Sequence, residues 1–201
     1  EFERKTIEVL RQPLETGYVT ISRAMNSVTY PARFMLAISI NPCPCGYFTD
    51  KVKECHCTPH QIQSYMSKIS GPLLDRIDIQ IEVPSVQYHE LVSDREVQSS
   101  ADIRGKVLVS RTMQKERFKD QPPMVNAHMS SKQTKKYCVL DKSAEAMLYQ
   151  AMTELGLSAR GHSKVLKVAR TIADLEESEH IKIEHISEAI QYRSLDRGLW
   201  K

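Results

Sequence analysis

Long apolar stretches are missing from this sequence of 201 residues. A helix that crosses a bilayer needs about 20 consecutive apolar residues, and no run here approaches that length. Residues 1–5 are mostly charged and do not resemble a signal peptide. We therefore expect a soluble, cytoplasmic protein without a membrane partner. The sequence also begins without Met, inside an expected helix, so we expect a fragment of a longer protein.

The phosphate-binding loop of many ATPases is missing as well. The pattern G-x-x-x-x-G-K-[ST] has no match, because Gly105-Lys106 has Ser100 in place of the first glycine and is followed by Val107. No apolar strand ending in Asp-Glu precedes the first helix. We therefore expect this chain to contain neither a phosphate-cradling loop nor a magnesium-binding carboxylate.

The composition is that of a globular protein. Hydrophobic residues make up 41% and charged residues 26% of the chain, which suits one or two domains with a buried core. The formal net charge of +3 and the pI near 8.6 are too mild to establish a nucleic-acid partner. Local clustering of charge is more informative than the total.

Three segments have the pattern of β-structure. Residues 34–40 are almost wholly apolar and lie between Pro31 and Asn41-Pro42, which predicts a strand buried on both faces. Residues 18–22 and 27–30 predict a hairpin with a four-residue loop at 23–26. Residues 77–83 alternate between apolar and polar side chains, which predicts a strand with one polar face.

Helical spacing predicts helices at 3–14, 59–69, 97–118, 141–155, 158–177 and 183–193. Asp141 and Ser158 are expected N-caps, and Gly156 is an expected C-cap. The helix at 97–118, ended by residues 121–123, carries a charged face of Arg104, Lys106, Arg111, Lys115, Glu116 and Arg117. We predict an α/β domain over 1–84, a linking helix region over 85–128 and an all-α bundle over 129–201.

Four of the five cysteines form two C-x-C pairs, Cys43/Cys45 and Cys55/Cys57, within a polar loop at 43–57. Four thiolates from two such pairs provide a tetrahedral shell for Zn²⁺, so we predict a structural zinc site. Disulfides or free thiols are the alternatives, although a cytosolic chain disfavours disulfides, and His56 or His60 could replace one thiolate. Cys138 stands alone and is expected to be an ordinary buried thiol.

Asn41 and Arg76 are candidate nucleotide-contacting residues. Asn41 follows the predicted buried strand, where α/β sheets place ligands, but it could equally serve to end that strand before Pro42. Arg76 lies between Asp75 and Asp78, so an ion pair with one of these carboxylates is the simpler interpretation. The alternative is an arginine delivered to the nucleotide of a neighbouring subunit.

Arg160 lies at the start of an expected helix, where a cation is disfavoured by the helix dipole unless an anionic ligand is present. His162 is interpreted as a surface residue, and Lys164, Lys167 and Arg170 as a solvated face of this helix. The loop of the predicted hairpin, which includes Arg23, Met25 and Asn26, is either a solvated turn or a contact for single-stranded nucleic acid.

Taken together, these segments resemble the magnesium-chelatase-like AAA+ ATPases, most closely their ComM/YifB branch. The resemblance covers nearly the whole chain. It is carried by residues 19–24, 30–34, 41–46, 55–59, 71–78 and 158–161. The two cysteine pairs favour this branch over the chelatase subunits proper.

The resemblance implies roles for individual residues. Asn41 matches sensor 1, Arg76 matches an arginine finger acting on a neighbouring subunit, and Arg160 matches sensor 2. Residues 18–30 match a hairpin that faces the pore and DNA in related motors. The fold implied is the C-terminal half of an AAA+ αβα core, followed by a helical lid domain at 129–201.

The same resemblance implies a longer, hexameric protein that uses ATP and Mg²⁺ to move DNA, as a branch-migration helicase in recombination or natural transformation. Because the P-loop and Walker B residues would lie upstream, we expect this chain alone neither to bind nor to hydrolyse ATP appreciably. Two alternatives stay open. One is a chelatase-type subunit that remodels a protein, and the other is a zinc-containing module that binds nucleic acid without catalysis.

Overall fold

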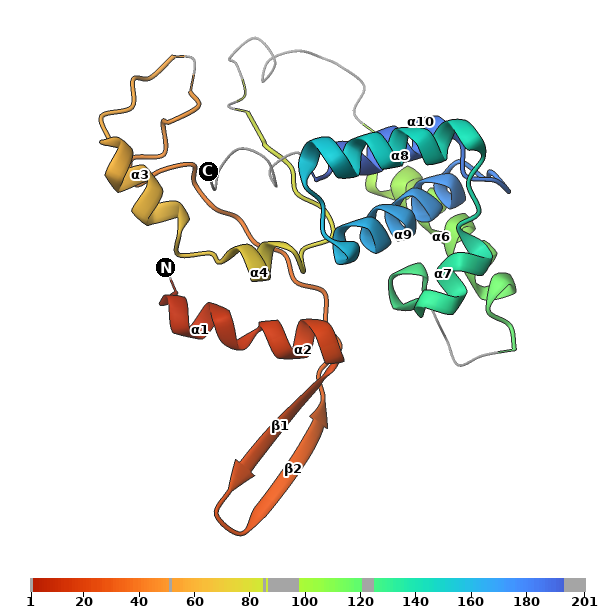
Figure 1. The fold of residues 1–201 in the computed structure, drawn as a ribbon, viewed down its shortest axis with the longest axis horizontal. Helices are drawn as coiled ribbons and strands as arrows, with labels where there is room; N and C mark the ends of the chain where they lie inside the picture. The colour runs from red at the N-terminus through yellow and green to blue at the C-terminus, as the bar shows by residue number, and fades with distance from the viewer. Residues whose placement is uncertain (1, 51, 85, 87–97, 121–124, 194–201) are drawn as a thin grey trace. The chain divides into compact units, whose positions relative to one another are not determined.

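A computed structural model describes residues 2–50, 52–84, 86, 98–120 and 125–193 (Figure 1). The described residues up to Ile77 form one compact unit, and those from Asp78 onward form a second. We refer to them as the N-terminal and C-terminal units. Residues 85, 87–97 and 121–124 of the predicted linking region lie outside the described residues, as do 194–201 of the predicted bundle and the predicted helix end at 121–123.

The N-terminal unit combines short helices with one hairpin. Its elements are α1 (Arg4–Val9), α2 (Arg11–Thr16), β1 (Tyr18–Arg23), β2 (Asn26–Pro31), α3 (Pro59–Met66) and α4 (Gly71–Leu74). The helix predicted at 3–14 is therefore two helices that meet at Leu10. Gly17 ends α2 with a φ of 74°, a left-handed conformation that glycine adopts without steric cost.

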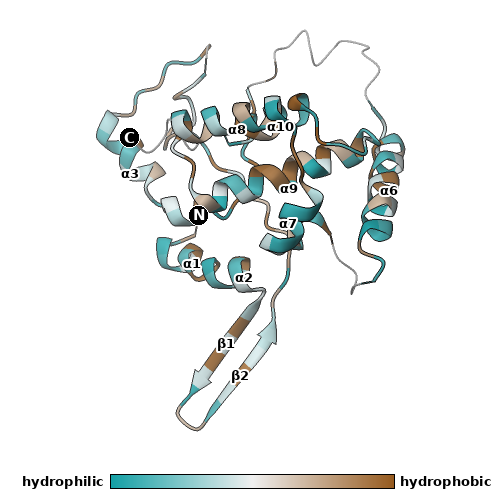
Figure 2. Ribbon diagram, turned by 45° about the vertical axis from the view of Figure 1, so that its right-hand side comes forward, coloured by the Kyte–Doolittle hydropathy of each residue, from teal (hydrophilic) through white to brown (hydrophobic). Residues whose placement is uncertain are grey.

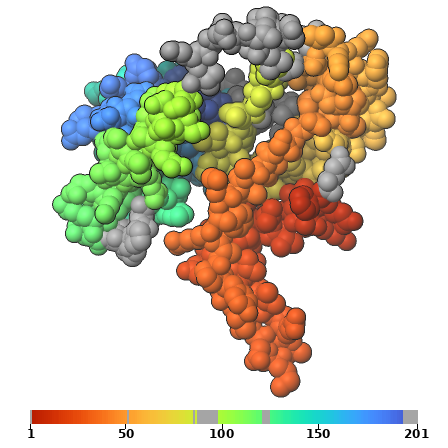
Figure 3. Space-filling view, turned by 180° about the vertical axis from the view of Figure 1, so that it is seen from behind, coloured from red at the N-terminus to blue at the C-terminus, as the bar shows by residue number. Residues whose placement is uncertain are grey.

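The predicted hairpin is confirmed, with a shorter turn than expected. β1 and β2 are antiparallel, and pairing continues to Arg23 opposite Asn26, so only Ala24 and Met25 form the turn. Figures 1 and 3 show the hairpin projecting beyond α1 and α2. Its two faces differ, because side chains alternate across a strand. Hydroxyl pairs lie on one face, and Val19, Ile21, Val28 and Tyr30 lie on the other.

The two other predicted strands are not formed. Residues 34–40 are described but belong to no strand, and Met35 is 93% exposed. In the segment 77–83, three of the four residues of the expected apolar face are exposed. Gln80, from the expected polar face, is buried and donates its backbone N–H to the Tyr192 carbonyl at 2.8 Å. The physical reason is that a strand needs a neighbour to pair with. Among the described residues, the only sheet is the two-stranded β1–β2 hairpin.

All regular elements described in the C-terminal unit are helices. It contains α6 (Ser100–Arg117), the 3₁₀ turn η1 (Asn126–His128), α7 (Ser131–Tyr137), α8 (Lys142–Leu155), α9 (Ala159–Leu175) and α10 (Ile183–Gln191). The predicted helices are confirmed to within a few residues, whereas η1 and α7 were not predicted. None of the helices described for this chain combines the length and the apolar character that crossing a membrane requires.

Helix α9 forms the centre of this unit and contacts α6, η1, α7 and α10. Its apolar residues Val165, Ala169 and Ile172 are buried, and Figure 2 shows the apolar character of this helix. Complete burial of a side chain such as Ile186 contributes about 1.5–3 kcal/mol. The N-caps Asp141 and Ser158 are confirmed, because each side chain accepts a backbone N–H of its helix. Gly156 is confirmed as the C-cap of α8.

A buried polar network joins α6, η1 and α9. Asp174 has no exposed side-chain surface, and its carboxylate accepts hydrogen bonds from Arg117 at 2.5 and 2.7 Å. It also accepts hydrogen bonds from Arg170 at 3.0 Å and from Asn126 at 2.8 Å. Arg170 also donates hydrogen bonds to the backbone carbonyls of Ser178 and Glu179. The negative charge is therefore balanced by two guanidinium groups, and the network connects three segments distant in sequence.

Replacing Asp174 with Asn should destabilise the C-terminal unit strongly. Removing one partner of a buried ion pair typically costs about 3–5 kcal/mol, because the remaining charge stays buried without compensation. The free energy of unfolding, measured by urea denaturation, should fall by about this amount. The matched control is Asp120→Asn at an exposed position, which should change it by less than about 0.5 kcal/mol. Equal effects of the two variants would contradict the central role of Asp174.

Candidate functional site

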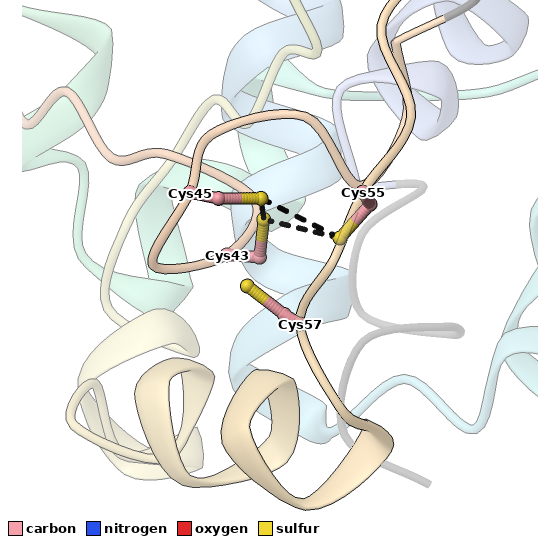
Figure 4. A group of neighbouring side chains, drawn as sticks. All are labelled: Cys43, Cys45, Cys55 and Cys57. Carbon is pink, nitrogen blue, oxygen red and sulfur yellow. Dashed lines mark hydrogen bonds between the residues drawn. The ribbon is translucent and has the colours of Figure 1, made fainter.

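The four loop cysteines converge on one point (Figure 4). The Cys43 sulfur lies 3.3 Å from that of Cys45 and 3.7 Å from that of Cys55, and Cys45 and Cys55 are 3.6 Å apart. All four sulfurs, including that of Cys57, lie within 4.8 Å of one another. Four sulfurs placed about 2.3 Å from a central zinc ion would stand about 3.8 Å apart. The cluster therefore has the dimensions of a tetrahedral metal site.

Local backbone structure holds both cysteine pairs in place. After the first pair, Gly46 adopts a φ of 85°, and its N–H donates to the Cys43 carbonyl at 3.0 Å. The second pair leads directly into α3 through Thr58. This residue accepts the Gln61 N–H and donates its own N–H to the Gln61 side chain, which is a complete capping box. A turn and a helix start thus orient the two pairs.

The donor set is suited to a metal that prefers sulfur. All four residues are free cysteines, so the disulfide alternative is not formed in this structure. His56 and His60 are exposed and do not belong to the cluster. Four thiolate ligands in tetrahedral geometry are typical of Zn²⁺ and of iron–sulfur centres. The geometry is therefore consistent with the four-thiolate set that the sequence predicts.

The electrostatics of the cluster also favour a bound cation. A backbone hydrogen bond from Tyr47, followed by a side-chain hydrogen bond from the Cys43 sulfur, lowers the pKa of Cys45 to about 6. A backbone hydrogen bond at Cys57 lowers the pKa of Cys55, but burial and the neighbouring sulfurs of Cys45 and Cys43 outweigh it and raise that pKa to about 12. Ionisation of Cys45 is thus favoured, whereas ionisation of Cys55 is opposed by burial and by the neighbouring sulfurs. A divalent cation would remove this opposition.

Arg76 lies just beyond α4 and is held by partners within the N-terminal unit. Its side chain is 10% exposed and forms an ion pair with Glu15 of α2. It also donates to the Pro72 carbonyl at 2.5 Å. The structure pairs Arg76 with Glu15, a partner that the sequence did not suggest. Asp78, one of the two suggested partners, pairs with Lys164. The guanidinium group therefore has a defined orientation.

The other predicted nucleotide-contacting residues lie at exposed positions. Asn41 is exposed and lies two residues before Cys43, outside any strand. Arg160 is the second residue of α9 and is exposed, next to the capped N-terminus at Ser158. Arg76 and Asn41 belong to the N-terminal unit and Arg160 to the C-terminal unit. His162 is half-buried, and Lys164 is ion-paired and not simply solvated.

The tip of the hairpin is open to solvent. Arg23, Met25 and Asn26 are all exposed, with Met25 at 92%. Both strands are exposed along almost their whole length, including the apolar face. The tip is thus accessible to a partner in this structure.

Two arginines have different surroundings from those expected. The sequence suggested that Arg117 and Arg170 belong to solvated charged faces, but both bind the buried Asp174. A signal was present in the sequence: Asp174 lies four residues after Arg170 and next to the apolar position Ala173. An ion pair at this spacing on a buried helix face is the expected way to accommodate a carboxylate there.

Comparison with known proteins identifies the family. Residues 1–91 match the family model described as magnesium chelatase, subunit ChlI, and residues 97–193 match that of the ChlI C-terminal region. The chain therefore belongs to the magnesium-chelatase-like family, in its ComM/YifB branch.

Within this family, the competence protein ComM of Haemophilus influenzae is 42% identical over the full chain. The uncharacterized protein YifB of Escherichia coli is 39% identical over 99% of it. The uncharacterized protein Rv2897c of Mycobacterium tuberculosis is 30% identical over 96%. The chain spans 38% of the length of each of these relatives.

Proposed function

We propose that this chain is the C-terminal part of an ATP-dependent, hexameric AAA+ DNA motor of the branch-migration helicase type. The observation that carries the proposal is its 42% identity, over the full chain, to a protein named for competence. DNA taken up in competence must be processed by recombination, and a DNA motor fits that need. In this proposal the protein is cytoplasmic, and residues outside this chain supply the ATP-binding loop and the magnesium carboxylate.

Three residues of this chain would complete the ATP site. Asn41 would orient the attacking water as sensor 1, and Arg160 would approach the γ-phosphate as sensor 2. Arg76 would act as the arginine finger toward a neighbouring subunit. Its ion pair with Glu15 and its bond to the Pro72 carbonyl support this role, because they hold a guanidinium group ready before the nucleotide is met. An incoming phosphate would compete with Glu15 for it.

The hairpin tip at Arg23, Met25 and Asn26 would contact DNA. The exposure of both strands and of the tip supports this part of the proposal. Arg23 can bind a phosphate, and the flexible thioether of Met25 can pack against bases of varied shape.

A second candidate function is that of a chelatase-type subunit that uses ATP to remodel a protein partner. The family models, both described by a magnesium chelatase subunit, favour it. The four-cysteine cluster has no evident use in that activity. DNA would then not stimulate ATP turnover.

The cysteine cluster is proposed as a structural Zn²⁺ site formed by Cys43, Cys45, Cys55 and Cys57. With four protein ligands, the metal would retain no open position for catalysis and would instead hold the loop together. The buried position of Cys43 and the short sulfur–sulfur distances support this assignment.

Freshly reduced protein should contain about one zinc ion per chain by metal analysis. Cys45→Ser should lose the metal, because three thiolates close a weaker site. Cys138→Ser is the matched control, since burial raises the pKa of this thiol to about 11 and it lies outside the cluster. Zinc should remain bound in that variant. A zinc content well below one per chain in the wild-type protein would contradict the site.

The DNA-motor proposal is tested by the ATP turnover of the intact protein with and without forked or four-way DNA. Strong stimulation is expected, because motors of this kind couple hydrolysis to movement on their substrate. Double-stranded DNA without branches is the comparison substrate. Turnover that ignores every DNA would overturn the proposal and favour the chelatase-type function.

Arg76→Ala should lower ATP turnover by about 10³-fold or more, because an arginine finger stabilises charge in the transition state. Nucleotide binding should change little, as measured with a fluorescent ATP analogue. Arg11→Ala removes another partly exposed arginine of the same unit, ion-paired with Glu8, and should leave turnover unchanged. Unchanged turnover of the Arg76 variant would remove this residue from the proposed role.

A further inference from the structure

Helix α6 carries three basic residues in one stripe. Arg104, Arg111 and Lys115 are separated by seven and four residues, and all three are exposed. At 3.6 residues per turn their directions fall within an arc of about 40°, over a length of about 16 Å. We call these three residues the α6 basic stripe. Figure 3 shows α6 on the surface of the molecule.

Buried contacts of α6 fix the direction in which the stripe points. Ser110 and Gln114 are buried, and Arg117 is bound to Asp174 of α9. These three side chains define the inward side of the helix. The centre of the α6 basic stripe lies about 80° to 140° around the helix from these three side chains, and the stripe residues are exposed. The helix therefore presents the stripe on a supported scaffold.

The stripe lacks compensating negative charge. None of its three cations has an ion-pair partner among the residues that the structure describes. The two carboxylates of α6 lie about 100° or more around the helix from each stripe residue and have other partners. Asp102 caps the helix start with Ser99, and Glu116 pairs with Lys119.

This arrangement is unfavourable for an isolated helix. Arg111 and Lys115 are like charges at a spacing of four residues, which destabilises a helix. A polyanion would relieve this repulsion and release its own counterions on binding. Evenly repeated negative charges along a line of about 16 Å are characteristic of a nucleic-acid backbone, which presents about half a duplex turn over that length.

We propose that the α6 basic stripe binds the phosphate backbone of DNA. We expect this contact to be independent of base sequence, because the three residues would bind phosphates and not base edges. It provides a second DNA contact on the C-terminal unit, in addition to the hairpin tip of the N-terminal unit. The choice of DNA as the partner rests on the proposed function.

The test is the salt dependence of DNA binding by the intact protein, measured by fluorescence anisotropy with a labelled duplex of random sequence. A non-hydrolysable ATP analogue is kept present so that the assembly state is constant. The variant is the triple substitution Arg104→Gln, Arg111→Gln and Lys115→Gln, because glutamine keeps the helix propensity and removes the charge. Circular dichroism and the thermal midpoint verify that the variant is folded.

The slope of log affinity against log salt should fall in the variant by about 2.7 if the stripe of one chain contacts DNA, for three lost phosphate contacts, and by more if several chains of the assembly do so. Raising salt from about 50 to 200 mM should therefore weaken the wild-type complex at least about 40-fold more than that of the variant. The charge-matched control is Lys132→Gln, Lys135→Gln and Lys142→Gln on exposed positions of α7 and α8. This control should retain the wild-type slope.

Three other outcomes would contradict either the DNA contact of the α6 basic stripe or the proposed DNA function. An unchanged slope in the stripe variant, with wild-type binding intact, overturns the stripe and leaves the proposed function standing. An equal loss of slope in the control variant assigns the effect to net charge and also overturns the stripe. If the wild-type protein shows no salt-dependent DNA binding, the proposed DNA function fails together with this inference.

Discussion

The carboxylate of Asp174 lies between two guanidinium groups, and the arrangement of the C-terminal unit depends on this contact. Apolar packing is not directional, so the buried apolar side chains of α9 alone could pack against neighbouring helices in several orientations. The hydrogen bonds of Asp174 with Arg117 and Asn126 select one of them, because they need α6 and η1 at defined positions. A buried charge without these partners would be costly.

The same contact has a consequence for the surface. Because Arg117 is directed inward, the remaining basic residues of α6 that share a face are directed outward. A buried ion pair thereby determines which charges are available to a partner. In the cysteine loop, too, structural contacts determine what can be bound. The backbone turn at Gly46 and the cap of α3 bring four sulfurs together in the geometry of a metal site.

The two segments that were predicted as strands outside the hairpin are not covered. Many large apolar residues of 34–40 in the N-terminal unit and of 78–83 in the C-terminal unit remain exposed, and so do the strands of the hairpin. The apolar pattern of these segments is suited to a strand that is paired with other strands and covered by other elements. The pattern itself does not supply those neighbours. Pairing requires neighbouring strands, and among the described residues those segments have none.

Local rules were sufficient wherever the determinant was close in sequence. The hairpin, the helices of the C-terminal unit, the caps at Asp141, Gly156 and Ser158 and the convergence of two cysteine pairs depend on contacts between near neighbours. The family could also be identified from short motifs, and the comparisons bear this out. Propensity, capping and short loop closure act over a few residues, so the sequence alone determines them.

Tertiary structure decided the remaining features. The pairing of Arg76 with Glu15, the binding of Arg117 to Asp174 and the exposure of the predicted strands depend on residues distant along the chain. An isolated arginine beside two aspartates gives no indication that a glutamate about sixty positions earlier will be its partner. Such contacts are selected by the packing of whole elements, since burial and charge compensation are satisfied only when those elements meet.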